Sequence, residues 1–153
     1  TISNFENLTG SSYADTLLGN LGANILNGGA GNDTLNGGLG NDILIGGAGA
    51  DKFVFNTAIN STTNKDTIKD FTVAVDKIVL ENAIFTKLAT GTLNSASFVS
   101  NGTKAIEAND YLIYNKTDGK LFYDADGNGA GAAIQFATLN TNLLLTNADF
   151  TVI

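Results

Sequence analysis

The sequence predicts an all-β chain, with a solenoid of stacked strands followed by a mostly antiparallel β-sheet or sandwich region. Glycine recurs every nine residues through the first third of the chain, and an apolar residue keeps a fixed place in each nine-residue unit. The remainder alternates apolar and polar residues between turn signals. We therefore expect a leading strand or cap at 1–9, the solenoid at 10–54 and a second β-region at 55–153.

Five consecutive units make up the repeat. They are GSSYADTLL (10–18), GNLGANILN (19–27), GGAGNDTLN (28–36), GGLGNDILI (37–45) and GGAGADKFV (46–54). The first position is always Gly, the sixth is Asp or Asn, and the eighth is Leu or Phe. A flexible Gly/Ser linker has no such phase, so the low-complexity interpretation is rejected.

Each unit reads as six turn residues followed by three strand residues. Glycine permits tight turns, and the middle strand residue points inward while its two neighbours point outward. Two units then form one rung of 18 residues, and successive rungs stack at about 4.8 Å. The inward side chains form one wall of Leu17, Leu35 and Phe53 and a second wall of Leu26 and Leu44.

Composition and charge exclude several classes of function. The chain has no Cys, His, Trp, Met, Pro or Arg, so it forms no disulfide, no Ser-His-Asp triad and no His-ligated zinc site. The net charge is −7, and five acids with no base precede Lys52. This argues against nucleic acid and anionic membranes and indicates a cationic partner. No apolar run approaches the roughly 20 residues of a membrane helix. Because Thr1 is not a natural start, we expect a fragment of a longer protein.

The predicted core is too thin to fold unaided. One buried apolar side chain per unit contributes about 1.5–3 kcal/mol, whereas ordering each residue costs about 1–2 kcal/mol. Units two apart overlie one another, which places Asp15, Asp33 and Asp51 in one ladder and Asn24 and Asp42 in another. Stacked carboxylates repel unless a cation lies between them. A site built from carboxylates and turn carbonyls suits Ca²⁺, which takes 6–8 oxygen ligands, whereas transition metals favour nitrogen or sulfur.

The segment GGAGNDTLNGGLGNDILI (28–45) resembles the GGxGxDxUx nonapeptide of the repeats-in-toxin (RTX) family. The resemblance implies a right-handed parallel β-roll with several Ca²⁺ ions in its turns. It also implies a C-terminal module similar to the tails of secreted RTX proteases, epimerases and adhesins. The first two units depart from the motif, since Tyr13 replaces the fourth-position glycine and Asn24 replaces the aspartate. The sites that involve these units are therefore expected to be distorted or to lose a charge.

The expected calcium ligands are the turn carbonyls and the sixth-position side chains of the five units. They are Gly10, Ser12, Asp15, Gly19, Leu21, Asn24, Gly28, Gly29, Ala30, Gly31, Asn32, Asp33, Gly37, Gly38, Leu39, Gly40, Asn41, Asp42, Gly46, Gly47, Gly49 and Asp51.

The fourth unit lacks a partner two units later, because FNTAINSTT (55–63) has no repeat character. We expect Asp66 or Asp70, in DTIKDF, to close this half-site, and the alternative is an ordinary acidic turn before a strand. The segment 66–81 is similar to the one that follows the roll in RTX proteases and alginate epimerases.

The second β-region contains a predicted hairpin at 110–124, with Asp118-Gly119 as its turn signal, and further strands at 132–139 and 148–153. A short turn is expected within 94–100. The candidate core residues of this region are Phe85, Phe98, Leu112, Tyr114, Phe122, Ile134, Phe136 and Leu144.

The loop DADGNG (124–129) places Asp124, Asp126 and Asn128 at alternate positions, as at the start of an EF-hand loop. Gln135 replaces the bidentate Glu at position twelve, and the flanks are strands. Two interpretations stay open, a separate and weaker Ca²⁺ site or a turn rich in residues that favour turns without metal.

The last residues, NADFTVI (147–153), resemble the C-termini of RTX proteins exported by the type I ABC apparatus; the alternative is a final core strand, and both can be true. The chain is thus predicted to be a non-enzymatic module, secreted or attached to a cell surface, that folds on extracellular Ca²⁺ and carries the export signal. One alternative is a terminal adhesin or surface-layer module with a cell-surface or matrix ligand. Another is the tail of a secreted enzyme such as a metalloprotease, lipase or epimerase, whose catalytic residues lie upstream.

Overall fold

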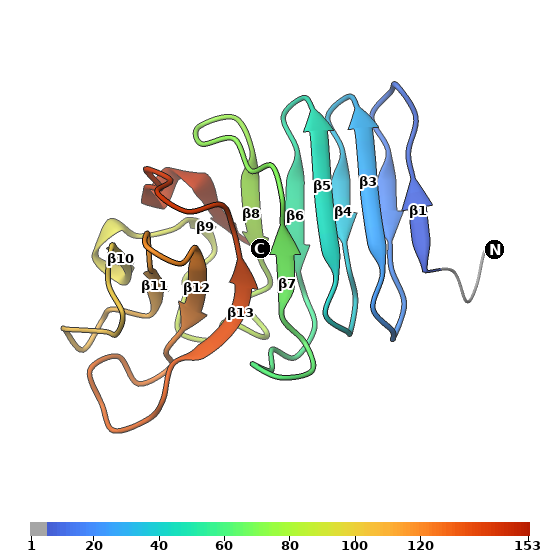
Figure 1. Cartoon of the computed structure of the whole chain (residues 1–153). Helices are drawn as coiled ribbons and strands as arrows, with labels where there is room; N and C mark the ends of the chain where they lie inside the picture. Colours follow the sequence, from blue (N-terminus) through green and yellow to red (C-terminus); the bar gives the residue numbers. More distant parts are fainter. Residues whose placement is uncertain (1–5) are drawn as a thin grey trace.

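Two β-sheets stack face to face in the computed structural model, which describes residues 6–153 (Figure 1). The eight-stranded sheet has the order β1 (Asn7–Thr9), β3 (Ile25–Ala30), β5 (Ile43–Ala48), β7 (Asp66–Ile68), β13 (Ile134–Thr138), β12 (Lys120–Tyr123), β11 (Leu112–Tyr114) and β10 (Phe98–Ser100). The six-stranded sheet has the order β2 (Thr16–Leu18), β4 (Thr34–Asn36), β6 (Lys52–Phe55), β8 (Lys77–Leu80), β14 (Phe150–Val152) and β9 (Gly91–Thr92).

Successive strands of the repeat alternate between the two sheets, so every second strand pairs in parallel. Figure 1 shows these strands as a row of rungs from the blue N-terminal end to the green β7 and β8. Leu17 pairs with Leu35 and Leu35 with Phe53, and Leu26 pairs with Leu44 in the other sheet. The predicted walls are therefore confirmed, and the repeat forms a parallel β-roll.

The rungs do not stop where the nonapeptide pattern stops. Strands β7 and β8 pair in parallel with β5 and β6, although 24 or 25 residues now separate the partners. Phe53 is paired with Ile78, and Ile78 with Phe150 of the last strand. At the other end, β1 pairs with β3, so that Leu8 lies beside Leu26. The predicted leading segment 1–9 otherwise falls partly outside the described residues.

The C-terminal region completes both sheets of the roll. The predicted hairpin is present, since β11 and β12 are antiparallel and Gly119 has a positive φ of 74° in the turn. Strand β13 pairs antiparallel with β12 and parallel with β7, and β14 pairs parallel with β8 and antiparallel with β9. The predicted short turn is a 3₁₀ helix at Ser95–Ser97, and a second spans Asn147–Asp149. The division at residue 54 stays a prediction, and both sheets cross it.

Four of the eight candidate core residues of this region are buried, namely Phe85, Leu112, Tyr114 and Phe136, while Phe98 and Phe122 are half-buried. The assignments of Ile134 and Leu144 are wrong, because these side chains are 39% and 70% exposed.

Two local features explain these errors. The register of β12 with β13 shifts between Leu121 and Phe122, and Ile134, the first residue of β13, is exposed although its partner Tyr123 is buried. Leu144 lies in a connection without strand periodicity, and the neighbouring Leu145 is the buried residue there.

None of the helices in the described part of the chain is long and apolar enough to span a membrane.

Candidate calcium-binding turns

The sixth-position residues form two ladders, one in the turns that lead into β2, β4 and β6 and the other in the turns that lead into β3 and β5. Within each ladder, the side chain of one rung accepts a hydrogen bond from the backbone N–H of the equivalent residue one rung earlier. Asp15 N–H donates to Asp33 Oδ1 and Asp33 N–H to Asp51 Oδ1, both at 2.8 Å. Asn24 N–H donates to Asp42 Oδ1 at 2.8 Å. The structure thus places the stacked residues above one another, with one carboxylate oxygen of each committed to the backbone.

The second carboxylate oxygen is the unusual feature of these turns. In Asp33, Asp42 and Asp51 the Oδ2 atom is buried and has no hydrogen-bond partner, and each residue is only 1% exposed. A buried ionised oxygen without a partner is costly in free energy, so such an atom requires an explanation. A cation is the partner that an unpaired carboxylate oxygen favours.

First-position glycines leave room beside these oxygens. A Cβ added to Gly28 would touch Asp33 Oδ2 and lie 2.6 Å from the carbonyl oxygen of Gly46, the equivalent glycine one rung later. At Gly37 and Gly46 an added Cβ would likewise meet the Oδ2 of the same turn. A side chain at these positions would fill the space where a carboxylate oxygen and a backbone carbonyl converge.

The donor set around this space is made of oxygen. Within residues 6–153, no three Asp or Glu side chains gather as a metal cluster, so an ion in these turns relies on backbone carbonyls as well as carboxylates. Hard cations that accept six to eight oxygens in flexible geometry match this composition, and Ca²⁺ is the best fit. The residues present therefore fit the ion that the sequence predicts.

Burial also affects the protonation of the acids. Desolvation raises the pKa of Asp42 and of Asp51, and the neighbouring carboxylates of Asp76 and Asp33 raise that of Asp51 further. Burial raises the pKa of Asp66 to about 7, with the carboxylate of Asp42 adding to the effect. The turns thus concentrate negative charge that lacks a matching positive group of the protein.

Both candidates for the half-site beside the fourth unit accept hydrogen bonds from the backbone of the roll. Asp66 continues the ladder, because its Oδ1 accepts the N–H of Asp42 at 3.0 Å. Asp70 instead accepts the N–H groups of Gly46 and Gly47 at 2.9 and 2.8 Å. Whether either one binds calcium stays a prediction.

Asp76 was not among the predicted site residues, and it continues the other ladder by accepting the N–H of Asp51 at 2.9 Å. Its signal is the order Asp-x-apolar, shared by Asp76-Lys-Ile, Asp66-Thr-Ile and Asp51-Lys-Phe. The longer spacing after the fifth unit hid this similarity.

The side chains of the fifth-position asparagines accept hydrogen bonds from the backbone of the next rung. Asn32 Oδ1 accepts the N–H of Ala50 at 2.9 Å, and Asn41 Oδ1 accepts the N–H of Lys65 at 3.0 Å. Both side chains are exposed and tie one turn to the next rung. Their backbone carbonyls, and those of the second to fourth positions, remain predicted ligands.

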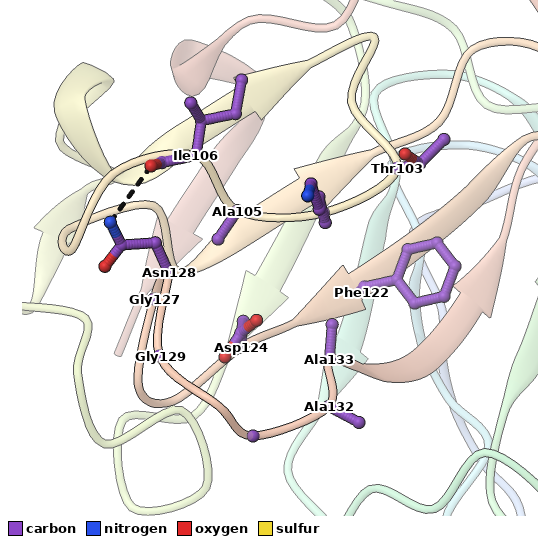
Figure 2. Close-up of a pocket in the computed structure, with 12 residues that line it drawn as sticks. Thr103, Ala105, Ile106, Phe122, Asp124, Gly127, Asn128, Gly129, Ala132 and Ala133 are labelled. Carbon is purple, nitrogen blue, oxygen red and sulfur yellow. Dashed lines mark hydrogen bonds between the residues drawn. The ribbon is translucent and has the colours of Figure 1, made fainter.

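The DADGNG loop lies far along the chain from the ladders and borders a pocket of about 470 Å³ (Figure 2). Asp124 is buried and accepts the N–H of Asp126 at 3.3 Å, while Asp126 Oδ2 accepts the N–H of Gly131 at 2.9 Å. Asn128 donates to the carbonyl of Ile106 at 3.2 Å. These hydrogen bonds are those of an Asx-rich turn, and the calcium interpretation of this loop stays a prediction.

One comparison with known proteins, the family-model match, agrees with the predicted repeat. The family model described as the RTX calcium-binding nonapeptide repeat (4 copies) matches residues 4–35 and 18–53. No curated protein sequence matches the chain.

Two solved structures are similar to the chain. One is the solution structure of the AlgE6R3 subunit from the Azotobacter vinelandii mannuronan C5-epimerase, at 25% identity and a TM-score of 0.49, covering 93% of this chain and 80% of that one. The other is the extracellular lipase LipA from Serratia marcescens, at 22% identity and a TM-score of 0.40, covering 99% of this chain and 22% of the lipase.

The repeat spacing, the parallel roll and the matching family model agree on one assignment. Residues 4–53 of the chain carry RTX calcium-binding nonapeptide repeats, and repeats of this kind bind Ca²⁺ ions.

Proposed function

We propose that this chain is a calcium-triggered folding module of a larger secreted protein and that its last residues carry a type I export signal. The observation that carries the proposal is the set of three buried carboxylate oxygens without hydrogen-bond partners, on Asp33, Asp42 and Asp51. We propose no catalytic role for this chain. Its partners are Ca²⁺ and, during export, the ABC secretion apparatus.

The physical basis is that the folded roll is expensive without the ion. Folding buries carboxylates that the unfolded chain leaves in water, and no basic residue precedes Lys52 to compensate them. Extracellular calcium modules bind with a Kd of about 10⁻⁴–10⁻³ M, far above free calcium in a cytoplasm. An ion that binds only the folded state stabilises it by mass action, so the roll folds where calcium is abundant.

The position of the last strand supports this order of events. Strand β14 lies between β8 and β9, and its Phe150 and Val152 are almost fully buried. A secretion apparatus that reads the end of the chain must therefore read it before this strand is built into the sheet. Folding that waits for extracellular calcium keeps the end accessible inside the cell.

Circular dichroism of the full chain in excess chelator and in 10 mM CaCl₂ tests the coupling. We expect a β spectrum in calcium and a largely unfolded spectrum in chelator. Equal β content in both conditions would overturn the proposal that calcium triggers folding.

Export is tested separately, by co-expression with a type I ABC apparatus. Deletion of residues 148–153 is expected to abolish export, whereas Asp33→Asn, which leaves those residues intact, should still be exported. Export of the truncated chain at the level of the intact chain would overturn the signal assignment.

A further inference from the structure

The outer face of the six-stranded sheet carries a groove of about 420 Å³ where the roll meets the C-terminal strand. Strands β4, β6, β8 and β14, which are neighbours in this sheet, supply its lining together with the residue after β14. The lining residues are Thr34, Lys52, Val54, Lys77, Val79, Thr151 and Ile153. A cavity of this size falls in the range of small-molecule sites, and none of its residues is a predicted calcium ligand.

Val79 forms the floor of the groove. Its neighbours in β8, Ile78 and Leu80, are fully buried in the core between the sheets. Because side chains alternate along a strand, Val79 points to the outer face, yet it is only 7% exposed. An outward side chain stays this buried only where its neighbours rise above it, so the groove is walled rather than flat.

Two lysines stand side by side at one end of the groove. Lys52 in β6 pairs with Lys77 in β8, and Thr34 in β4 pairs with Lys52. Like charges directly opposite each other on neighbouring strands destabilise a sheet. None of the lining residues is acidic, and within residues 6–153 the ion pair of a lysine is that of Lys120 with Asp118. The two adjacent lysines therefore lack a counter-charge from the described part of the chain.

The other end of the groove is apolar. Val54 pairs with Val79, and each follows its lysine by two residues, so all four side chains share the outer face. Ile153 lies further along this face, two residues after Thr151, which pairs with Val79. The groove thus runs from a cationic end to an apolar end.

We propose that this groove binds a small organic carboxylate with an apolar body, its carboxylate at Lys52 and Lys77 and its body over Val54 and Val79. Such a ligand supplies the missing negative charge and covers the apolar end. Lys77 already donates to the carbonyl of Ala148 at 2.9 Å, whereas the ammonium group of Lys52 has no hydrogen-bond partner within residues 6–153. One fully available ammonium group and one partly committed group match a single negative charge better than a phosphate dianion.

NMR spectroscopy of the ¹⁵N-labelled full chain in 10 mM CaCl₂, titrated with sodium hexanoate, locates the site. We expect saturable shifts of the amide signals of Lys52, Lys77 and Thr151, with that of Asp118 unchanged. The absence of saturable shifts up to about 50 mM hexanoate, or shifts confined to other parts of the chain, would overturn the inference.

Two further probes separate the contributions of the head and the body of the ligand. Acetate carries the same charge without the body, and we expect it to bind at least about tenfold more weakly than hexanoate, since each buried methylene adds favourable transfer free energy. Hexan-1-ol carries the body without the charge and is expected to bind about two- to fivefold more weakly than hexanoate. Equal binding of either probe and hexanoate would contradict a site that recognises both ends of its ligand.

A matched pair of lysine variants tests the role of charge. Lys52→Gln should weaken hexanoate binding about two- to fivefold, the range of an exposed ion pair. Lys69→Gln is the control, because Lys69 is also exposed and does not line the groove. Equal weakening by both variants would indicate unspecific attraction to a charged surface and overturn the assignment. Circular dichroism in calcium verifies that both variants fold like the unaltered chain.

Discussion

Replacement of Leu35 by Ala tests how the thin core and the calcium ions share the stabilisation of the roll. Leu35 is fully buried and lies between Leu17 and Phe53 in the wall of stacked side chains. Loss of a buried Leu side chain costs about 3 kcal/mol through lost transfer free energy and the cavity that remains. The stacked walls of the roll are one side chain thick, so under the proposed function the bound ions supply part of the stabilisation that this core does not.

The size of the effect follows from linkage. Above its Kd, each bound ion contributes about 1.4 kcal/mol for every tenfold increase in calcium concentration. With one ion in each of the three turns with unpartnered oxygens, a tenfold increase contributes about 4 kcal/mol. A loss of about 3 kcal/mol then corresponds to roughly 0.7 decades, or about a fivefold higher calcium midpoint of folding.

The assay is a calcium titration at 25 °C followed by far-ultraviolet circular dichroism. Leu18→Ala is the matched control, because Leu18 is 60% exposed and changes at such sites stay within about 0.5 kcal/mol. Its midpoint should move by less than about 1.4-fold by the same arithmetic. An unshifted midpoint for Leu35→Ala, or an equal shift for Leu18→Ala, would refute the idea that core packing and calcium binding are exchangeable sources of stability.

Two further substitutions test single contacts. Gly31→Ala should lower the Tm in calcium by at least about 3 °C, because Gly31 has a φ of 120° and an added Cβ would lie 2.5 Å from a neighbouring backbone carbon. Gly22 occupies the same repeat position without a positive φ and has 3.5 Å of clearance, so calorimetry of Gly22→Ala should show little change, and an equal loss would contradict the explanation. Tyr114→Phe removes a buried hydroxyl that donates to the carbonyl of Asn140 at 2.7 Å and accepts the N–H of Leu143 at 3.3 Å. Urea unfolding in calcium should show a loss of about 1 kcal/mol, and an unchanged stability would mean that solvent satisfies these groups.

The sequence predicted the roll well because its period is enforced by local chemistry. A nine-residue unit with an apolar residue at the eighth place can bury Leu26 against Leu44 in one way only, so spacing alone sets the register. The ladders followed from the same spacing. What the spacing could not reveal was the unpartnered Oδ2 of Asp33, since this depends on where the folded turn places its hydrogen-bond donors.

The later part of the chain was less predictable, because there register depends on distant partners. Asp76 stands 25 residues after Asp51 rather than 18, and a search for a fixed period misses it. The burial of Leu145 rather than Leu144 likewise depends on a connection without strand periodicity. Strand existence could be predicted from alternation, but the parallel pairing of β13 with β7 could not, since their sequences lie far apart.

The continuity of the two sheets has a consequence for folding. One apolar core runs from Leu17 through Phe53 to Phe150, so the roll and the last strand bury their side chains against a common set of neighbours. The end of the roll would expose Ile78 if β14 were absent, because Phe150 lies beside it in the adjacent strand. The roll therefore gains its final cover only when the last residues of the chain are available. If calcium triggers folding as proposed, calcium binding in the early turns and burial of the C-terminal strand are parts of one cooperative transition, and a chain still held by its C-terminus could not complete it.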